Sequence, residues 1–232
     1  MPDAAIFADP GWEGDGTYEI LEWLTEVLPF PVHTVRANGN IREDAVKGMT
    51  VQGNKFSTLP FFTITGGMGR RQCTADYKIR PIRLETRRLL GLNPGERAKS
   101  KGHSVEQWIG ITKDEASRMA PSRDKYIENR WPLIELGMSR RDCINWMKSQ
   151  GHPEPPKSSC VGCPFKDDLA WKNSTPSEFA DAVAFDKAIR NTGTTEAQFV
   201  HRSCKPLGEV DFSSADAQIN MFGNECSGVC GV

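Results

Sequence analysis

The stretch that decides the fold is DAAIFADPGWEGDGTYEILEWLTEVLPFPVHTVRA, residues 3–37. Its two short apolar runs, DAAIFAD and FPVHTVRA, flank a segment in which Ile20, Leu21, Leu24 and Leu28 recur at helical spacing. A strand, a helix and a second strand in this order are typical of one βαβ unit, whose two strands are parallel. The sequence therefore predicts a parallel sheet that begins close to the N-terminus.

The rest of the chain continues the alternation of strands and helices. We expect helices in GNIREDAVKG (39–48) and KIRPIRLETRRLLG (78–91), and strands in VEQWIGI (105–111) and AQFVHR (197–202). Capping-box patterns, in which Ser or Thr precedes Glu or Asp by three residues, predict helices that start after Thr112, Ser139 and Thr175. This order predicts an α/β fold.

Two regions are expected within this fold. Residues 1–170 should form a mostly parallel, Rossmann-like sheet with flanking helices. Residues 171–232 should form a helical, loop-rich and cysteine-rich extension that packs on the sheet.

Composition excludes several classes of function. The 232 residues contain 29 Lys and Arg against 30 Asp and Glu, so the whole chain has no net attraction for nucleic acid or anionic membranes. A local excess of basic residues does occur between Gly67 and Lys101. No apolar run is long enough to span a bilayer and no signal-peptide layout opens the chain, so we expect a cytoplasmic protein.

The cysteines are the strongest chemical signal in the chain. Cys160 and Cys163 form a C-x-x-C pair followed by Pro164, a spacing that lets two thiolates reach one metal. A structural zinc site, an iron–sulfur cluster and a thioredoxin-like dithiol all use this spacing. Two inert buried thiols are a further alternative, which the neighbouring proline and glycine residues disfavour. The proline-rich HPEPP segment before the pair is unlike the strand that precedes a redox dithiol. Further thiols are available at positions 73, 143, 204, 226 and 230.

Three segments resemble a known family. CTADYKIRPIR (73–83) is similar to the Cys-Cys-x-x-Arg-Lys-x-x-Pro-Leu segment of the adenylyl-sulfate and phosphoadenylyl-sulfate reductases. IFADPGWE (6–13) and WIGITKDEASRM (108–119) resemble two further elements of that superfamily. The similarity is closer to phage and bacterial proteins of the phosphoadenosine-phosphosulfate-reductase-like group. It covers residues 4 to about 190 and implies an adenine nucleotide α-hydrolase fold, an adenine nucleotide ligand and a 4Fe-4S cluster.

The resemblance also implies roles for individual cysteines. Cys73, Cys160 and Cys163 would ligate the cluster, or zinc in its place, with Cys143 as the fourth ligand because Thr74 replaces the second cysteine of the tandem pair. Cys226 or Cys230 could substitute for Cys143, and both are also candidates for the catalytic thiol that sulfonucleotide reduction requires.

The family's Ser-Gly-Gly-x-Asp-Ser phosphate loop has no counterpart in the chain. We therefore expect that the first strand and loop of the family fold are missing, through truncation or true loss. Nucleotide or sulfonucleotide binding would then depend on the following residues: Asp9, Arg70, Lys78, Arg80 and Arg118. Asp9 has an alternative role as the cap of the turn that follows its strand.

These observations lead to two functional hypotheses. The first is a sulfonucleotide-reductase-like or sulfur-transfer enzyme with a cysteine-bound 4Fe-4S cluster, for which a nucleic acid is a candidate sulfur acceptor. The second is a non-catalytic module, held together by zinc or a cluster, whose basic segment binds nucleic acid or a protein partner. Neither hypothesis involves a membrane.

Overall fold

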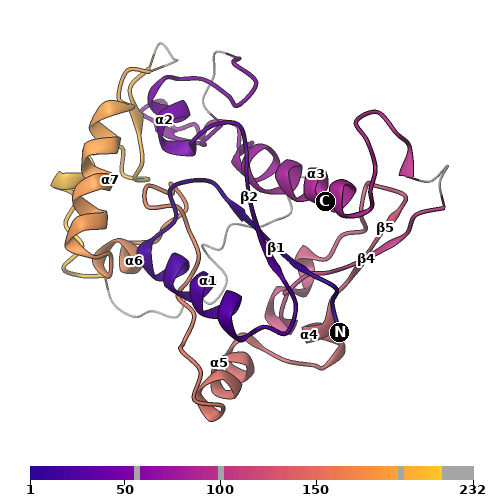
Figure 1. Cartoon of the computed structure of the whole chain (residues 1–232). Coiled ribbons are helices and arrows are strands. Elements are labelled where there is room, and N and C mark those ends of the chain that lie inside the picture. The colour runs from indigo at the N-terminus through magenta and orange to yellow at the C-terminus, as the bar shows by residue number, and fades with distance from the viewer. Residues whose placement is uncertain (55–57, 99–101, 193–195, 216–232) are drawn as a thin grey trace.

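A βαβ unit opens the chain, as the sequence predicts. The structure is a computed structural model, which describes residues 1–54, 58–98, 102–192 and 196–215 (Figure 1). Strand β1 (Ala5–Asp9) is followed by α1 (Asp15–Val27) and by β2 (Val32–Arg36). The two strands pair in parallel register from Ala5 opposite Val32 to Asp9 opposite Arg36.

The next two predicted helices also form. Helix α2 (Ile41–Val46) begins at Asn40, whose side chain accepts hydrogen bonds from the amides of Arg42 and Glu43. A π-helical turn, Ala75–Ile79, leads directly into α3 (Arg80–Leu89), which carries a proline in its first turn. Helix α3 packs on β1 and β2.

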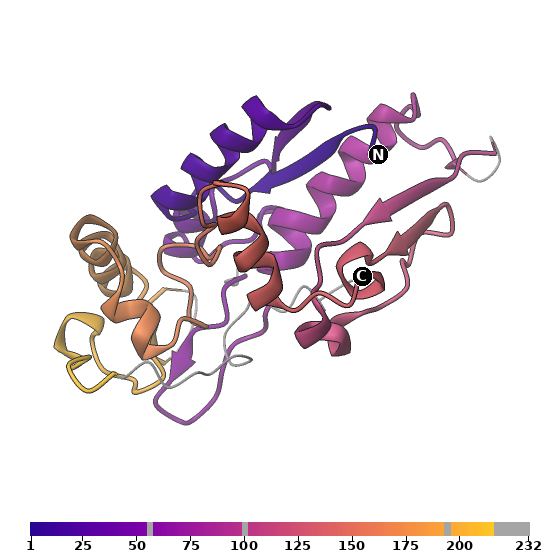
Figure 2. The same ribbon diagram turned by 90° about the horizontal axis from the view of Figure 1, so that it is seen from below.

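A second parallel pair follows α3 in the chain. Strand β4 (Val105–Trp108) pairs with β5 (Ile127–Arg130), and Figure 2 shows α3 between this pair and β1. The sequence does not predict β5 because the segment IENR lacks the apolar alternation of a strand. A 3₁₀ helix (Lys113–Arg118) lies between the strands, and α4 (Pro132–Glu135) and α5 (Arg140–Ser149) follow them.

The C-terminal part of the described chain adds helices and one antiparallel strand. Helices α6 (Asp168–Lys172) and α7 (Pro176–Ala188) precede β6 (Gln198–Phe199), and a 3₁₀ turn at Leu207–Glu209 comes last. Strand β6 pairs antiparallel with β3 (Phe62–Thr63). The described strands therefore form three two-stranded sheets, two parallel and one antiparallel, in a mixed α/β architecture.

The core joins α7 to the C-x-x-C loop. The rings of Trp12 and Phe185 lie 4.4 Å apart in an edge-on contact, and Gly162 lies against them. A Cβ atom at Gly162 would clash with the Trp12 ring, so only glycine fits at position 162 of the C-x-x-C loop. None of the described helices is both long and apolar enough to cross a bilayer.

Candidate functional site

A cavity of about 780 Å³ lies between α3, the β4–β5 pair, the 3₁₀ helix and α5. Basic residues outnumber acidic residues in its wall. The acidic residues are Glu115 and Asp124, and the basic residues are Lys78, Arg80, Arg83, Arg118, Arg123, Arg140 and Lys157. We call it the cationic cavity. Three of the five predicted nucleotide-binding residues, Lys78, Arg80 and Arg118, belong to its wall.

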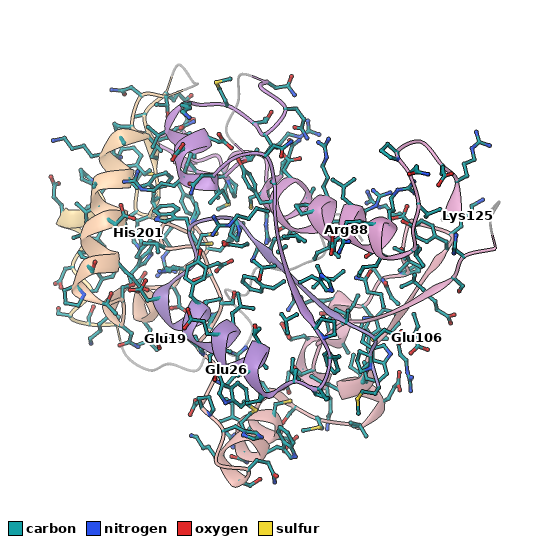
Figure 3. All side chains as sticks on the ribbon, viewed as in Figure 1. Glu19, Glu26, Arg88, Glu106, Lys125 and His201 are labelled. Carbon is teal, nitrogen blue, oxygen red and sulfur yellow. The ribbon has the colours of Figure 1, made fainter. Side chains whose placement is uncertain are left out.

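Strand alternation explains which residues of β4 and β5 face this cavity. Successive side chains of a strand point to opposite faces, and Gln107 is paired with Asn129. Both of these residues line the cavity, together with Ile127. On the other face, Arg130 forms an ion pair with Glu106 at 3.2 Å, and Glu106 is labelled in Figure 3.

The basic residues of the cavity are only partly neutralised. Arg83 pairs with Asp124 at 2.6 Å, and Arg118 pairs with Glu115. Within the described ranges, Arg80, Arg123 and Lys157 form no ion pair. The excess of positive charge, enclosed by apolar walls, favours an anionic ligand.

The predicted capping box at Thr112 does not form, so this sequence prediction is wrong. The Glu115 carboxylate pairs with Arg118 instead of reaching back to the amide of Thr112, and the helix that follows is 3₁₀ and not α. The Thr112 hydroxyl makes no cap hydrogen bond. All three side chains line the cationic cavity.

A second, much smaller cavity of about 20 Å³ brings three cysteines together. Cys73, Cys160 and Cys163 all line it, and we call it the thiol cavity. Cys160 is anchored by a β-bridge to Glu13, and the amide of Cys163 donates to the carbonyl of Cys160 at 3.1 Å. Cys73 lies in the segment just before the π-helical turn, and its amide donates to the carbonyl of Thr58 at 3.1 Å.

Burial controls the chemistry of the central thiol. The pKa of Cys160 is raised well above its ordinary value, first by desolvation and then by the Glu13 carboxylate. Lys78 opposes this rise, whereas Cys163 and Cys73 add to it. The thiol is therefore protonated at neutral pH, and a metal would have to displace its proton.

An ion pair lies in the wall between the two cavities. Lys78 donates from Nζ to Oε1 of Glu13 at 2.9 Å, and Ser158 donates to the other carboxylate oxygen at 3.3 Å. The Glu13 side chain is completely buried, whereas 29% of the Lys78 side chain is exposed. Lys78 and Thr74 line both cavities, so the cationic cavity and the thiol cavity adjoin each other.

The two other cysteines of the described chain, Cys143 and Cys204, do not line the thiol cavity. Cys143, on α5, lines the cationic cavity, and burial, followed by Asp142 and Asp114, raises the pKa of its thiol. Cys204 donates to the carbonyl of Thr63, next to the β3–β6 pair. Cys226 and Cys230 lie outside the described residues.

Asp9 and Arg70 line neither cavity. Both carboxylate oxygens of Asp9 are used within the βαβ unit: Oδ1 accepts from the amide of Gly11 (2.7 Å) and the hydroxyl of Tyr18 (2.9 Å). Oδ2 accepts from Nε of Arg36 at 2.7 Å. Arg70 is exposed on the turn that follows β3.

Three residues of the site were not identified from the sequence. Glu13 is the last residue of the IFADPGWE segment, but that segment assigned it no role, and its position at the site depends on the bridge to Cys160. Asn129 lies on β5, the strand that the sequence does not predict. Arg140 is the first residue of α5, and only the position of that helix brings it to the cavity.

The thiol cavity fits a thiolate-bound metal by its donor type but is not preorganised for one. Throughout the described part of the chain, no three His, Cys, Asp or Glu side chains are arranged so that they could hold a metal ion as they stand. The volume of about 20 Å³ accommodates about one water-sized occupant.

Comparisons of this chain with models of known protein families, with curated proteins and with solved structures find no match.

Proposed function

We propose that this protein binds an adenine nucleotide or sulfonucleotide in the cationic cavity, next to a metal centre held by Cys73, Cys160 and Cys163. The observation that carries the proposal is the shared wall, because Lys78 and Thr74 line both cavities. The activity that this arrangement supports is a sulfonucleotide-reductase-like or sulfur-transfer reaction. We further propose that the two parallel strand pairs belong to a Rossmann-like fold of the adenine nucleotide α-hydrolase type, and that the protein works in the cytoplasm.

Charge and shape support an anionic nucleotide as the ligand. Arg80 and Arg123 have no carboxylate partner in the described ranges, so they are available to phosphate or sulfate oxygens. Apolar side chains of α3, of the segment after β4 and of α5, among them Ile82, Ile109 and Ile144, provide the wall that a flat base requires.

The chain's own residues have separable tasks in such a reaction. Arg80 and Arg118 would orient the phosphates, and Lys78 would keep a positive charge between the anion and the thiols. An iron–sulfur centre, when bound, would supply electrons or sulfur. The buried Glu13 holds Lys78 in place.

One observation favours the alternative hypothesis, a structural metal in a non-catalytic binding module. The thiol cavity is the size of a single ion, and Cys160 belongs to the hydrophobic core. Zinc bound there would join the segment of Cys73, which leads into the π-helical turn, to the C-x-x-C loop. The basic wall of the larger cavity would then bind a nucleic acid or an acidic protein segment.

Anaerobic purification followed by elemental analysis tests the metal centre. Iron with matching sulfide would support the enzyme, and zinc would support the structural alternative. Replacement of Cys73, Cys160 or Cys163 by Ser should abolish metal binding, because each removes one thiolate ligand. Cys204→Ser is the matched control and should retain full metal content, since Cys204 lies outside the thiol cavity. Metal content that does not depend on these three thiols would contradict the proposal.

Titration with ATP and with adenylyl sulfate tests the cationic cavity. Arg80→Ala should weaken binding about tenfold or more, the usual effect of losing one charge-assisted hydrogen bond. Arg88→Ala is the control, because Arg88 lies on the same helix but pairs with Glu85 and does not line the cavity (Figure 3). Equal losses in the two variants would show that general surface charge, and not this cavity, attracts the nucleotide.

A further inference from the structure

Among the residues that line the cationic cavity, Thr112 and Asn129 each have a polar atom that no other described residue hydrogen-bonds. The hydroxyl of Thr112 is buried without a hydrogen-bond partner, and the residue is only 7% exposed. The amide oxygen Oδ1 of Asn129 is likewise buried without a partner. Both residues line the cavity. Buried polar atoms are nearly always hydrogen-bonded, so two such atoms on one cavity wall indicate a missing ligand.

The orientation of Asn129 determines what its free atom can bind. Its Nδ2 donates to the carbonyl of Ala120 at 2.9 Å, which leaves Oδ1 as the unused atom. A carbonyl-type oxygen only accepts hydrogen bonds. The ligand must therefore present an N–H or O–H donor at this position, whereas the Thr112 hydroxyl can either donate or accept.

The surroundings favour a nucleobase and not a sugar at Asn129. Ile127 lies on the same face of β5, two residues before Asn129, and both line the cavity. Ile109, just beyond β4, also lines it. An apolar surface with one fixed acceptor suits a flat base that carries an amino group.

We propose that Asn129 and Thr112 recognise the base of the bound nucleotide, with Asn129 accepting from the exocyclic amino group of adenine and Thr112 binding a ring nitrogen. This inference rests on the proposed nucleotide function and deepens it, because it makes the cavity specific for adenine. Hypoxanthine carries a carbonyl oxygen where adenine carries the amino group. In the same position, hypoxanthine would place its carbonyl oxygen against Oδ1 of Asn129, so two hydrogen-bond acceptors would meet and neither would find a donor.

The failed capping box agrees with this assignment. A Thr-x-x-Glu pattern would ordinarily use its hydroxyl to cap a helix, but here the hydroxyl of Thr112 stays unbonded at the cavity wall and Glu115 holds Arg118. The same short segment therefore contributes a base contact and a positioned arginine.

Thr112→Val tests the first contact with two opposite readouts. Valine keeps the shape of threonine and removes an unsatisfied buried hydroxyl, so the midpoint of urea unfolding should stay the same or rise. ATP affinity should nevertheless fall about tenfold. Thr86→Val is the matched control: Thr86 is also 7% exposed, but its hydroxyl donates to the carbonyl of Ile82 at 2.9 Å, and Thr86 itself does not line the cavity. In this control the midpoint of urea unfolding should not rise, because the Thr86 hydroxyl is already hydrogen-bonded, and ATP affinity should not change.

Parallel titrations with ATP and ITP test the second contact on the unmodified protein. ATP should bind at least about tenfold more tightly than ITP, and Asn129→Ala should reduce this preference to near unity. The ratio of the wild-type affinities for ATP and ITP tests the base contact even if the Asn129→Ala variant does not fold. Equal affinity for ATP and ITP, or a Thr112→Val variant that loses stability and keeps its ATP affinity, would overturn the base assignment alone. A wild type that binds neither nucleotide nor adenylyl sulfate would instead overturn the proposed function, and the base assignment with it.

Discussion

At the scale of single residues, two acidic side chains that follow β1 have different tasks. Asp9 closes the βαβ unit, because its carboxylate joins the turn at Gly11 to Tyr18 and Arg36. Glu13 is directed toward the site, where it pairs with Lys78 beside Cys160. A strand end in an α/β protein is a common ligand site, which made Asp9 a reasonable nucleotide candidate from sequence. The saturation of its oxygens supports the capping alternative.

Asp9→Asn should therefore affect stability and not ligand binding. The amide would present N–H groups to donors that now meet a carboxylate, so we expect a loss of about 2 kcal/mol in the free energy of unfolding. Urea denaturation measures this loss, and nucleotide titration should give the wild-type affinity. The exposed Asp3 provides the control variant Asp3→Asn, which should change neither quantity. If Asp9→Asn instead binds the nucleotide more weakly while its free energy of unfolding is unchanged, Asp9 contacts the ligand and the capping assignment is wrong.

At the scale of elements, α5 shows how a local signal places functional groups. The side chain of Ser139 accepts from the amide of Asp142 at 3.2 Å, and the amide of Ser139 donates to the Asp142 carboxylate at 2.8 Å. This capping box was predicted from sequence and is confirmed. It fixes the first turn of the helix that carries Arg140 and Cys143 into the cationic cavity.

Ser139→Ala should cost about 1 kcal/mol of stability and should also weaken ATP binding. The second effect follows because fraying of the first turn displaces Arg140 from the cavity wall. Thr175→Ala is a matched control, since Thr175 caps α7 through an equivalent box with Glu178, and α7 lines neither cavity. Thr175→Ala should cost a similar amount of stability without changing ATP affinity. Thermal unfolding and calorimetric titration of both variants measure the two effects separately.

At the scale of the whole molecule, the core depends on contacts between distant segments. Strand β6 pairs with β3, and α7 packs its Phe185 against Trp12 beside the C-x-x-C loop. The same core buries phenolic side chains. Burial, opposed by a hydrogen bond from the amide of Glu13 and reinforced by Asp9, raises the pKa of Tyr18 to about 12, and burial with a hydrogen bond to Asp44 raises that of Tyr77 further.

These two tyrosines predict a loss of stability at alkaline pH. In the unfolded chain a tyrosine ionises near its usual pKa of about 10, whereas in the folded protein Tyr18 keeps its proton until about pH 12. The unfolded state therefore binds fewer protons in this window, so stability is complete below pH 10 and falls as the pH rises toward 12. Urea midpoints measured from pH 8 upward should show the decline. Tyr18→Phe lowers stability at neutral pH, because it loses the bond to Asp9, but its decline with pH should be shallower; an unchanged slope would contradict the assignment.

Local patterns in the sequence predicted the elements that depend on neighbouring residues. The βαβ unit, α2, α3 and the capped helices α5 and α7 all follow from apolar spacing and from side chains within three residues of a helix start. The failures have two causes: a competing partner within the same short helix, and a strand partner that is distant in the chain. The Glu115 carboxylate does not cap the helix at Thr112, because it forms an ion pair with Arg118 at the cavity. The polar strand β5 forms because β4 supplies its hydrogen bonds.

The sequence by itself determined the mixed α/β class, the positions of most helices and the three cysteines at 73, 160 and 163 that the structure brings to one cavity. Only the tertiary structure decided that Cys143 lines the other cavity and that Lys78, paired with Glu13, lines both. It also decided that Thr112 and Asn129 keep polar atoms without a partner in the described part of the chain. The physical reason is the range of the interactions. Propensity, spacing and capping act within a few residues, whereas burial and charge pairing depend on which surfaces meet after folding.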